Sequence, residues 1–265
     1  MSQALTDSWE QGDPYERYIG RWSRLVAPLF LDWLDVPAGR DWLDIGCGTG
    51  ALSAAVLKQS RPRAVTAIEP SDGFRQTAER LLAGHATILA GSAANVPLPE
   101  ASVDAVVSGL VFNFIPDQAE ALREMTRVCR PGGTVAAYVW DYASGMQFLR
   151  IFWDAATALD PAAAQLDEGI RFPICREGTL GDLWTRHGFA AVSSRAIEVP
   201  TTFADFDDLW QPFLGGQGPA PSYVASLEPR ARNELADLVR SSLTAAEDGS
   251  LRLQARAWAV RGLVP

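Results

Sequence analysis

Three glycines at alternate positions, Gly46, Gly48 and Gly50, constrain the fold of this 265-residue chain more than any other feature. They follow a short apolar segment, residues 42–45, and precede residues 51–60, whose apolar spacing is that of a helix. Glycine tolerates the positive φ of a tight turn and lets a ligand approach bare backbone. The helix that follows presents unpaired N–H groups at its start. The run therefore predicts a strand–turn–helix unit with a ligand at the turn.

Strands and helices alternate from residue 41 to residue 141. Short apolar runs predict strands at residues 42–45, 64–68, 86–90, 103–108 and 134–140. Amphipathic stretches predict helices at residues 51–60, 71–83 and 116–130, with Ser71 as the N-cap of the second. This alternation is typical of an α/β fold, in which right-handed crossovers build a parallel sheet that is covered on both faces.

The pattern changes on both sides of this core. Residues 14–36 have helical spacing with Pro14 in the first turn, which predicts an N-terminal helical cap over about residues 1–38. Later segments predict helices at residues 145–158, 176–186 and about 229–246, and alternating strands at residues 190–199 and 251–260. We therefore expect a single domain, residues 1–265, with an antiparallel edge and a helical insert over about residues 200–249.

Charge and composition exclude several functions. The chain has 32 acidic against 23 basic residues and a net charge of −9, which disfavours a nucleic-acid partner. It has no run of 18 apolar residues and no signal peptide, so we expect no membrane partner and a cytoplasmic protein. The three separated cysteines, Cys47, Cys129 and Cys175, predict neither a disulfide framework nor a metal site. The oligomeric state is left open.

An acidic residue, Glu69, stands at the end of the second expected strand. In parallel α/β folds, a carboxylate at this place can accept hydrogen bonds from both hydroxyls of a ribose. Together with the glycine turn, Glu69 predicts a nucleoside-containing cofactor at the carboxyl ends of the strands. The alternative is a tight turn followed by a surface acid.

At this point the chain resembles the class I S-adenosylmethionine-dependent methyltransferases. The matching segments are LDIGCGTG (43–50), AIEPSDG (67–73), GSAANVPLPEASVDAVVS (91–108) and RVCRPGGTV (127–135). Three further segments resemble a group of generic bacterial small-molecule methyltransferases: YIGRWS (18–23), DLWQPFLGGQGPAP (208–221) and ARAWAVRG (255–262). The resemblance implies a Rossmann-like three-layer α/β/α sandwich. Its seven-stranded sheet would be mostly parallel, with the last strand antiparallel.

The resemblance also implies a cofactor, S-adenosyl-L-methionine, which becomes S-adenosyl-L-homocysteine, and a set of residues that bind it. Glu69 would bind the ribose. Tyr18 and Arg21 would bind the methionine carboxylate, and the alternative for them is an amphipathic helix that packs on the sheet. Many relatives carry Asp at the position of Ser92, so backbone groups of Ala93 and Ala94 are expected to replace its contact with the adenine. The other implied cofactor contacts are Asp44, Gly46, Cys47, Gly48, Gly50, Pro70, Ser71, Ser108, Gly109 and Leu110.

Methyl transfer from a sulfonium is an in-line displacement, so the protein mainly aligns the reactants. A general base is needed only when the acceptor must lose a proton. Asp141 follows the fifth expected strand and is the candidate for that role, while a turn or N-cap acid is the alternative. His85 and His187 are expected to be structural or surface residues. The acceptor-binding candidates are Asn113, Trp140, Tyr142, Trp210, Phe213 and Gln217, the last in a loop that is either a lid or a connector.

The sequence therefore predicts a methyltransferase that acts on a small organic acceptor. One alternative is a non-catalytic S-adenosylmethionine-binding regulatory protein. A nicotinamide-dependent oxidoreductase is the other, although the only lysine, Lys58, is not part of a Tyr-x-x-x-Lys pair. Residues 108–111 read SGLV rather than the Pro-Pro-aromatic pattern of amino-directed DNA and RNA methyltransferases.

Overall fold

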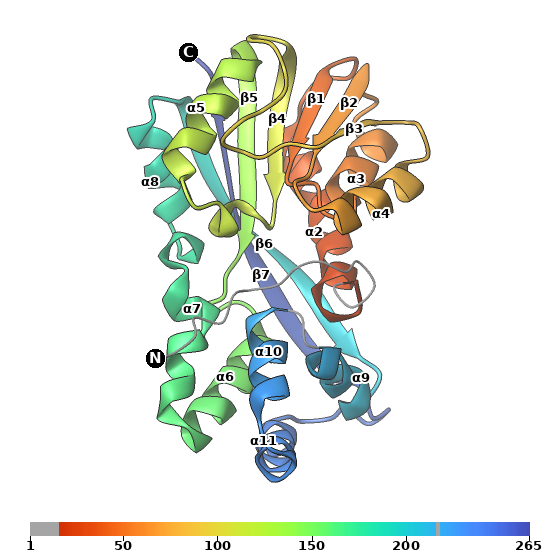
Figure 1. Ribbon diagram of the computed structural model, residues 1–265, viewed down its shortest axis with the longest axis vertical. Helices are drawn as coiled ribbons and strands as arrows, with labels where there is room; N and C mark the ends of the chain where they lie inside the picture. Colours follow the sequence, from red (N-terminus) through yellow and green to blue (C-terminus); the bar gives the residue numbers. More distant parts are fainter. Residues whose placement is uncertain (1–15, 216–217) are drawn as a thin grey trace.

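A computed structural model of the chain describes residues 16–215 and 218–265. Its centre is a seven-stranded sheet in the order β3-β2-β1-β4-β5-β7-β6 (Figure 1). The strands are β1 Asp41–Ile45, β2 Ala64–Ile68, β3 Thr87–Leu89, β4 Val103–Gly109, β5 Cys129–Trp140, β6 Ala190–Phe203 and β7 Leu251–Leu263. The pairs among β1 to β5 are parallel, and β7 runs antiparallel to both β5 and β6. This confirms the predicted α/β sheet.

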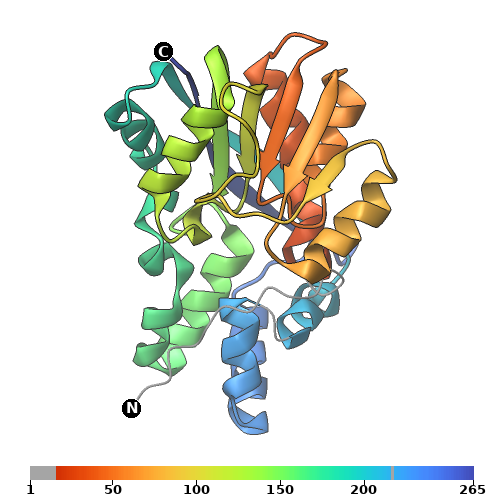
Figure 2. The ribbon, with the colours of Figure 1, turned by 45° about the horizontal axis from the view of Figure 1, so that its top comes forward.

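Helices cover both faces of the sheet (Figures 1 and 2). On one face, Phe30 packs against Tyr138 of β5 with ring centroids 4.6 Å apart. On the other, Trp184 donates a hydrogen bond to the carbonyl of Val135 of β5. The helices flanking the sheet are α2 Arg21–Leu34, α3 Ala51–Gln59, α4 Asp72–Leu82, α5 Gln118–Val128 and α8 Thr179–Arg186. Ser71 caps α4 as predicted, because its hydroxyl accepts from the N–H of Phe74.

Several predicted boundaries are wrong. The N-terminal helix is a short π-helical turn, η1 (Glu16–Gly20), that continues into α2, and Pro14 lies outside the described residues. The helix predicted at residues 116–130 ends at Val128, and β5 begins at Cys129 and includes Pro131–Gly133. The N–H of Gly132 donates to the carbonyl of Val264, and the carbonyl of Gly133 accepts from the N–H of Val264. Pro131, Gly132 and Gly133 are typical turn residues. Their sequence does not indicate a strand, because the segment that pairs with them lies at the far end of the chain.

A helical insert joins β6 to β7 and lies beside α6 (Gln147–Leu159), away from the sheet centre (Figure 1). Its elements are α9 Phe206–Trp210, η5 Gln211–Gly215, α10 Pro219–Ser226 and α11 Pro229–Ser241. Phe213 is fully buried and stacks on Phe152 of α6 with ring centroids 4.6 Å apart. The insert is therefore fastened to α6 by aromatic packing, and β6 extends to Phe203, past the predicted start of the insert.

Replacing Phe213 by Ala should lower the free energy of unfolding by about 3–5 kcal/mol, because a fully buried ring leaves a cavity that its neighbours cannot fill. Urea unfolding followed by circular dichroism measures this loss. The matched control is Leu214→Ala, since Leu214 is 44% exposed and should change stability by less than about 0.5 kcal/mol. Equal effects of the two substitutions would contradict the packing role of Phe213.

Candidate functional site

A cavity of about 510 Å³ opens at the carboxyl ends of β1, β2, β4 and β5, in the size range of small-molecule sites. Its walls come from η1 and α2, the glycine turn, the ends of the strands and the start of α3. The lining residues are Ile19, Ser23, Asp44, Gly46, Cys47, Gly48, Thr49, Ala51, Leu52, Glu69, Pro70, Ser71, Phe74, Gly109, Leu110, Val111, Phe114, Tyr138, Trp140 and Tyr142.

The glycine turn is tied to the end of β2. The N–H groups of Gly46 and Cys47 both donate to the carbonyl of Ile68, at 2.9 and 3.0 Å. Gly46 has φ +70°, and a Cβ there would lie 2.6 Å from Val111 Cγ1. Gly48 has φ +55° and open space where its Cβ would be. Gly46 is thus required by packing, while Gly48 leaves backbone accessible to a ligand.

Glu69 is held by backbone groups on both sides. One carboxylate oxygen accepts from the N–H of Gly48 and the other from the N–H of Ser71, each at 2.9 Å. Burial raises the pKa of Glu69, and these two hydrogen bonds oppose that rise. Each oxygen keeps a lone pair for a further hydrogen bond. Glu69 can therefore accept from two adjacent hydroxyl groups of one ligand.

Asp44 lies deeper in the same cavity, with 1% of its surface exposed. Its Oδ2 accepts a 2.7 Å hydrogen bond from the Ser53 hydroxyl, while Oδ1 has no partner. Burial raises the pKa of Asp44 to about 7. A buried carboxylate oxygen without a partner costs free energy, which a ligand ammonium group would recover. Asp44 therefore suits a cationic part of a ligand.

The end of β4 supplies a strained part of the wall. Leu110 adopts φ +62°, a left-handed conformation that a branched side chain disfavours. Its N–H donates at 2.8 Å to the carbonyl of Tyr138. Gly109 lies so close to Tyr138 that a Cβ would be 2.7 Å from the phenol oxygen. The sheet thus holds Leu110 in an unfavourable backbone conformation at the cavity.

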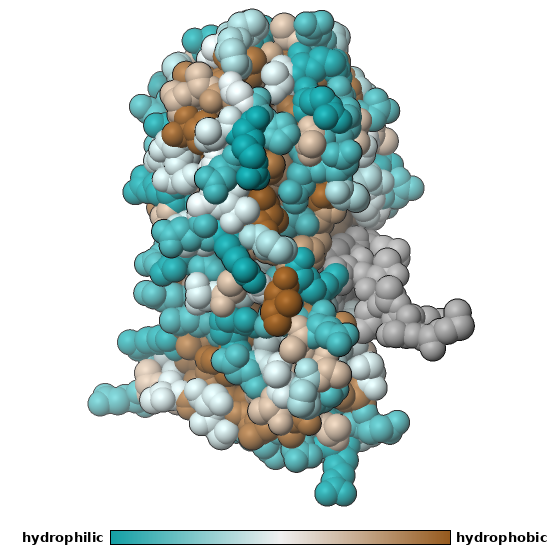
Figure 3. Space-filling model, turned by 90° about the vertical axis from the view of Figure 1, so that its left-hand side faces the viewer, coloured by the Kyte–Doolittle hydropathy of each residue, from teal (hydrophilic) through white to brown (hydrophobic). Residues whose placement is uncertain are grey.

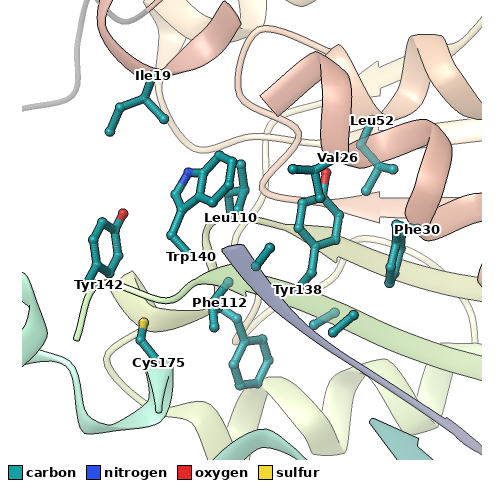
Figure 4. Packing of buried hydrophobic residues seen from close by; sticks show 14 of the residues in the cluster. Ile19, Val26, Phe30, Leu52, Leu110, Phe112, Tyr138, Trp140, Tyr142 and Cys175 are labelled. Carbon is teal, nitrogen blue, oxygen red and sulfur yellow. The ribbon is translucent and has the colours of Figure 1, made fainter. Parts of the chain in front are cut away.

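Two aromatic residues line the far end of the cavity: Trp140, the last residue of β5, and Tyr142, two positions later. Figure 4 shows the indole nitrogen of Trp140 and the hydroxyl of Tyr142 pointing toward the side where Ile19 lies. The Trp140 N–H is buried and has no hydrogen-bond partner. Nearby, burial raises the pKa of Tyr18, and the neighbouring Glu168 and Tyr142 add to this rise. This end of the cavity therefore offers polar groups between apolar walls.

Some predicted cofactor residues lie elsewhere. Ser108 is fully buried and donates to the carbonyl of Ile45 between strands, so its side chain does not line the cavity. Arg21 pairs with Asp208 at 2.9 Å and lies over the ring of Trp22, which occupies its guanidinium. Tyr18 packs edge-on against Phe213 in the aromatic cluster. Ser92, Ala93 and Ala94 also lie outside the lining, and Ser92 bridges to Asn95.

The candidate base does not face the cavity either. The carboxylate of Asp141 accepts from the N–H and the hydroxyl of Ser144, at 3.0 and 2.9 Å, and lies 3.5 Å from Arg256. Asp141 is 1% exposed and absent from the lining. These contacts match the alternative role considered from the sequence, an acid that shapes a turn.

Among the acceptor candidates that the structure describes, only Trp140 and Tyr142 line this cavity. Phe213 is buried in the aromatic cluster, and Trp210 packs beside it. Asn113 lines a second cavity, and Gln217 lies outside the described residues. No described residue of the insert lines this cavity.

Sequence reasoning missed several lining residues. The N-terminal helical segment contributes Ile19 and Ser23 to the lining instead of the predicted Tyr18 and Arg21. The spacing of four residues between Ile19 and Ser23 was a usable signal. Phe74 and Tyr138 carried none, because only the folded sheet brings α4 and β5 to the same opening.

Within residues 16–215 and 218–265, no three His, Cys, Asp or Glu side chains gather to hold a metal ion. In the same part of the chain, no helix is long and apolar enough to span a membrane.

Comparison with known proteins agrees with this geometry. Residues 43–137 match the family model described as a methyltransferase domain. The chain is 39% identical over 125 residues to the malonyl-[acyl-carrier protein] O-methyltransferase of Serratia marcescens, covering 47% of this chain and 43% of that protein. It is 34% identical over 110 residues to the demethylmenaquinone methyltransferase of Bacillus cereus, covering 38% and 45%. The chain thus spans less than half the length of these curated relatives.

Among solved structures, phosphoethanolamine N-methyltransferase 2 of Haemonchus contortus, in complex with S-adenosyl-L-methionine, is similar with a TM-score of 0.58. The identity is 14%, and the match covers 95% of this chain and 56% of that one, so the likeness concerns the fold. The matched family segment contains the glycine turn, Glu69 and the end of β4, which build the cavity described above. Residues 43–137 therefore match a methyltransferase domain, and the fold of the chain resembles that of an S-adenosylmethionine-dependent methyltransferase.

Proposed function

We propose that the chain is an S-adenosylmethionine-dependent methyltransferase that acts on a small organic acceptor. The observation that carries this proposal is the arrangement around Glu69. Two backbone N–H groups fix both of its oxygens toward the cavity that also holds the unpartnered oxygen of Asp44. A ribose and an ammonium group are the two parts of the cofactor that these carboxylates would bind. The family match favours this reading over a nicotinamide enzyme.

The residues that line the cavity fit the ribose and methionine parts of that cofactor. Glu69 would accept from the ribose hydroxyls, with Pro70 and Ser71 beside it. Asp44 would bind the methionine ammonium group, near the open backbone of Gly48. Gly109 and Leu110 line the same cavity and would also contact the cofactor. When bound, the cofactor supplies a methyl group on a positively charged sulfur.

The chain itself would contribute position and exclusion of water. Trp140 and Tyr142 are buried at the far end of the cavity, where their N–H and O–H groups can orient an acceptor atom. Orientation of this kind can supply about 7–11 kcal/mol of a reaction barrier. No histidine lines the cavity among the described residues, and Asp141 is held by Ser144. We therefore propose catalysis by positioning, with an acceptor that loses its proton easily.

The names of the relatives include different methyl acceptors, so they do not identify the acceptor of this chain. The Serratia relative is named for O-methylation of a malonyl group on a carrier protein, and the Bacillus relative for methylation of demethylmenaquinone. The remaining alternative is a regulatory protein that binds the cofactor without transferring its methyl group.

Isothermal calorimetry with S-adenosyl-L-homocysteine should show one binding site on the intact chain. Labelled methyl transfer from S-adenosyl-L-methionine to a panel of hydroxyl, amine and carbon acceptors then tests activity. Failure of the intact, folded protein to bind the cofactor would overturn the proposal. Retained binding without transfer to any member of the panel would instead support the regulatory alternative.

Replacing Glu69 by Ala should weaken cofactor binding by about 1–3 kcal/mol, because a charged hydrogen-bond acceptor for the ribose is lost. Calorimetry measures this as a five- to 150-fold rise in the dissociation constant. Glu79→Ala is the matched control, since Glu79 is exposed on α4 and does not line the cavity. An unchanged affinity in a folded Glu69 variant would remove the ribose assignment.

The affinity for S-adenosyl-L-homocysteine should fall as the pH drops below about 7. The pKa of Asp44 is raised to about 7 by burial, and an ammonium group favours its ionised form, so below this pH binding must first remove a proton. The loss should approach tenfold per pH unit between pH 7 and 5.5, measured by calorimetry. Asp44→Asn should bind weakly at pH 7.5 and lose affinity less steeply on acidification. An equal slope in both proteins would contradict the role of Asp44.

A further inference from the structure

A second cavity, of about 750 Å³, lies beside the cofactor cavity. It is open to solvent, and η2 (Phe112–Phe114) and the start of α5 form one of its sides. Its other side is formed by α7 (Glu168–Arg171), η4 (Pro173–Cys175) and α8. These elements lie on the side of the molecule seen in Figure 3, where hydrophobic patches interrupt a hydrophilic surface. Its volume lies in the range of small-molecule sites.

The charge of this second cavity is opposite to that of the chain. Arg171 and Arg186 both line it, and no acidic residue is among its described lining residues. The chain as a whole carries a net charge of −9. Two guanidinium groups at one site favour an anion, because arginine matches carboxylate and phosphate oxygens with paired N–H groups. Arg171 also lies over the ring of Phe172 and attracts the buried carboxylate of Glu168 on the same helix.

A buried amide provides a second, independent sign of a ligand. Asn113 lines the cavity with 6% of its surface exposed, yet neither its Nδ2 nor its Oδ1 has a hydrogen-bond partner. A buried amide whose oxygen and nitrogen both lack a hydrogen-bond partner destabilises the folded protein. A polar ligand group in the cavity would satisfy it.

Aromatic side chains lie between the two cavities. Phe114 lines both of them. Its ring centroid lies 5.1 Å from that of Phe172, which lies 6.2 Å from that of Tyr142 at the acceptor end of the cofactor cavity. A molecule with an apolar body along these side chains would have one end near the arginines and the other near Tyr142.

We propose that the second cavity binds the methyl acceptor by an anionic group, and that the acceptor carries a carboxylate or phosphate on an apolar body. This inference rests on the proposed function and adds the substrate class to it. Arg171 and Arg186 bind the anion, Asn113 completes its hydrogen bonds, and Phe114 and Phe172 contact the apolar body.

Calorimetry on the intact chain with S-adenosyl-L-homocysteine bound tests the inference with three matched probes. These are 3-phenylpropionate, 2-phenylethyl phosphate and the neutral 3-phenylpropanamide. At least one anion should bind ten times more tightly than the amide, and the stronger of the two anions identifies the headgroup. If neither anion binds, or if the amide binds equally well, the inference is wrong.

The variant Arg171→Gln/Arg186→Gln should bind the preferred anion at least tenfold more weakly. Arg195→Gln is the control, because Arg195 is an exposed arginine of β6 outside both cavities. S-Adenosyl-L-homocysteine should bind all three proteins equally, which also shows that the variants are folded. Equal anion binding by the double variant would overturn the inference alone, whereas loss of cofactor binding by the unaltered protein would overturn the proposed function.

Discussion

The fold of the site depends on the hydrogen bonds that join the glycine turn to the end of β2. Ile68 accepts from two successive N–H groups of the turn, and Glu69 accepts from a third, that of Gly48. The turn leaves β1 while Glu69 leaves β2, so these bonds clamp the ends of two neighbouring parallel strands together. Without them the glycines would have no defined shape, and neither carboxylate would have a fixed direction. The cavity lies directly beside these hydrogen bonds, which fix the shape of the part of its wall formed by the turn and Glu69.

The two carboxylates of the cavity differ in how their charge is stabilised. Glu69 has two backbone donors, whereas Asp44 has one hydroxyl donor and an unpartnered oxygen. Burial raises the pKa of both, so part of their charge is left for a ligand to stabilise. The same logic extends to the second cavity, where Asn113 is buried and unsatisfied. Polar groups that lack a partner in the protein alone gain hydrogen bonds when a ligand binds, and this gain contributes to the binding free energy.

Aromatic packing explains why several expected ligand contacts fell elsewhere. Tyr18 and Phe213 join one cluster with Phe148 and Phe152, which fastens the insert to α6. Periodicity shows that such residues face something apolar, but a ligand and a neighbouring ring leave the same pattern. Arg21 was ambiguous in the same way, since its partner Asp208 lies in a distant segment of the chain. In each case the side chain contacts a protein group from a distant segment instead of a ligand, and the sequence around it does not indicate that group.

The sequence by itself determined the parallel core, the glycine turn, the placement of Glu69 and the N-cap at Ser71, because each follows from local backbone chemistry or a repeated strand–helix period. It also indicated that Trp140 and Tyr142 stand at the end of a central strand. Only the tertiary structure decided which side of the N-terminal helix lines the cavity, that Asp141 is held by Ser144, and that Asn113 belongs to a second cavity. Those outcomes depend on contacts between segments far apart in the chain, and such contacts leave no periodic trace in any one of them.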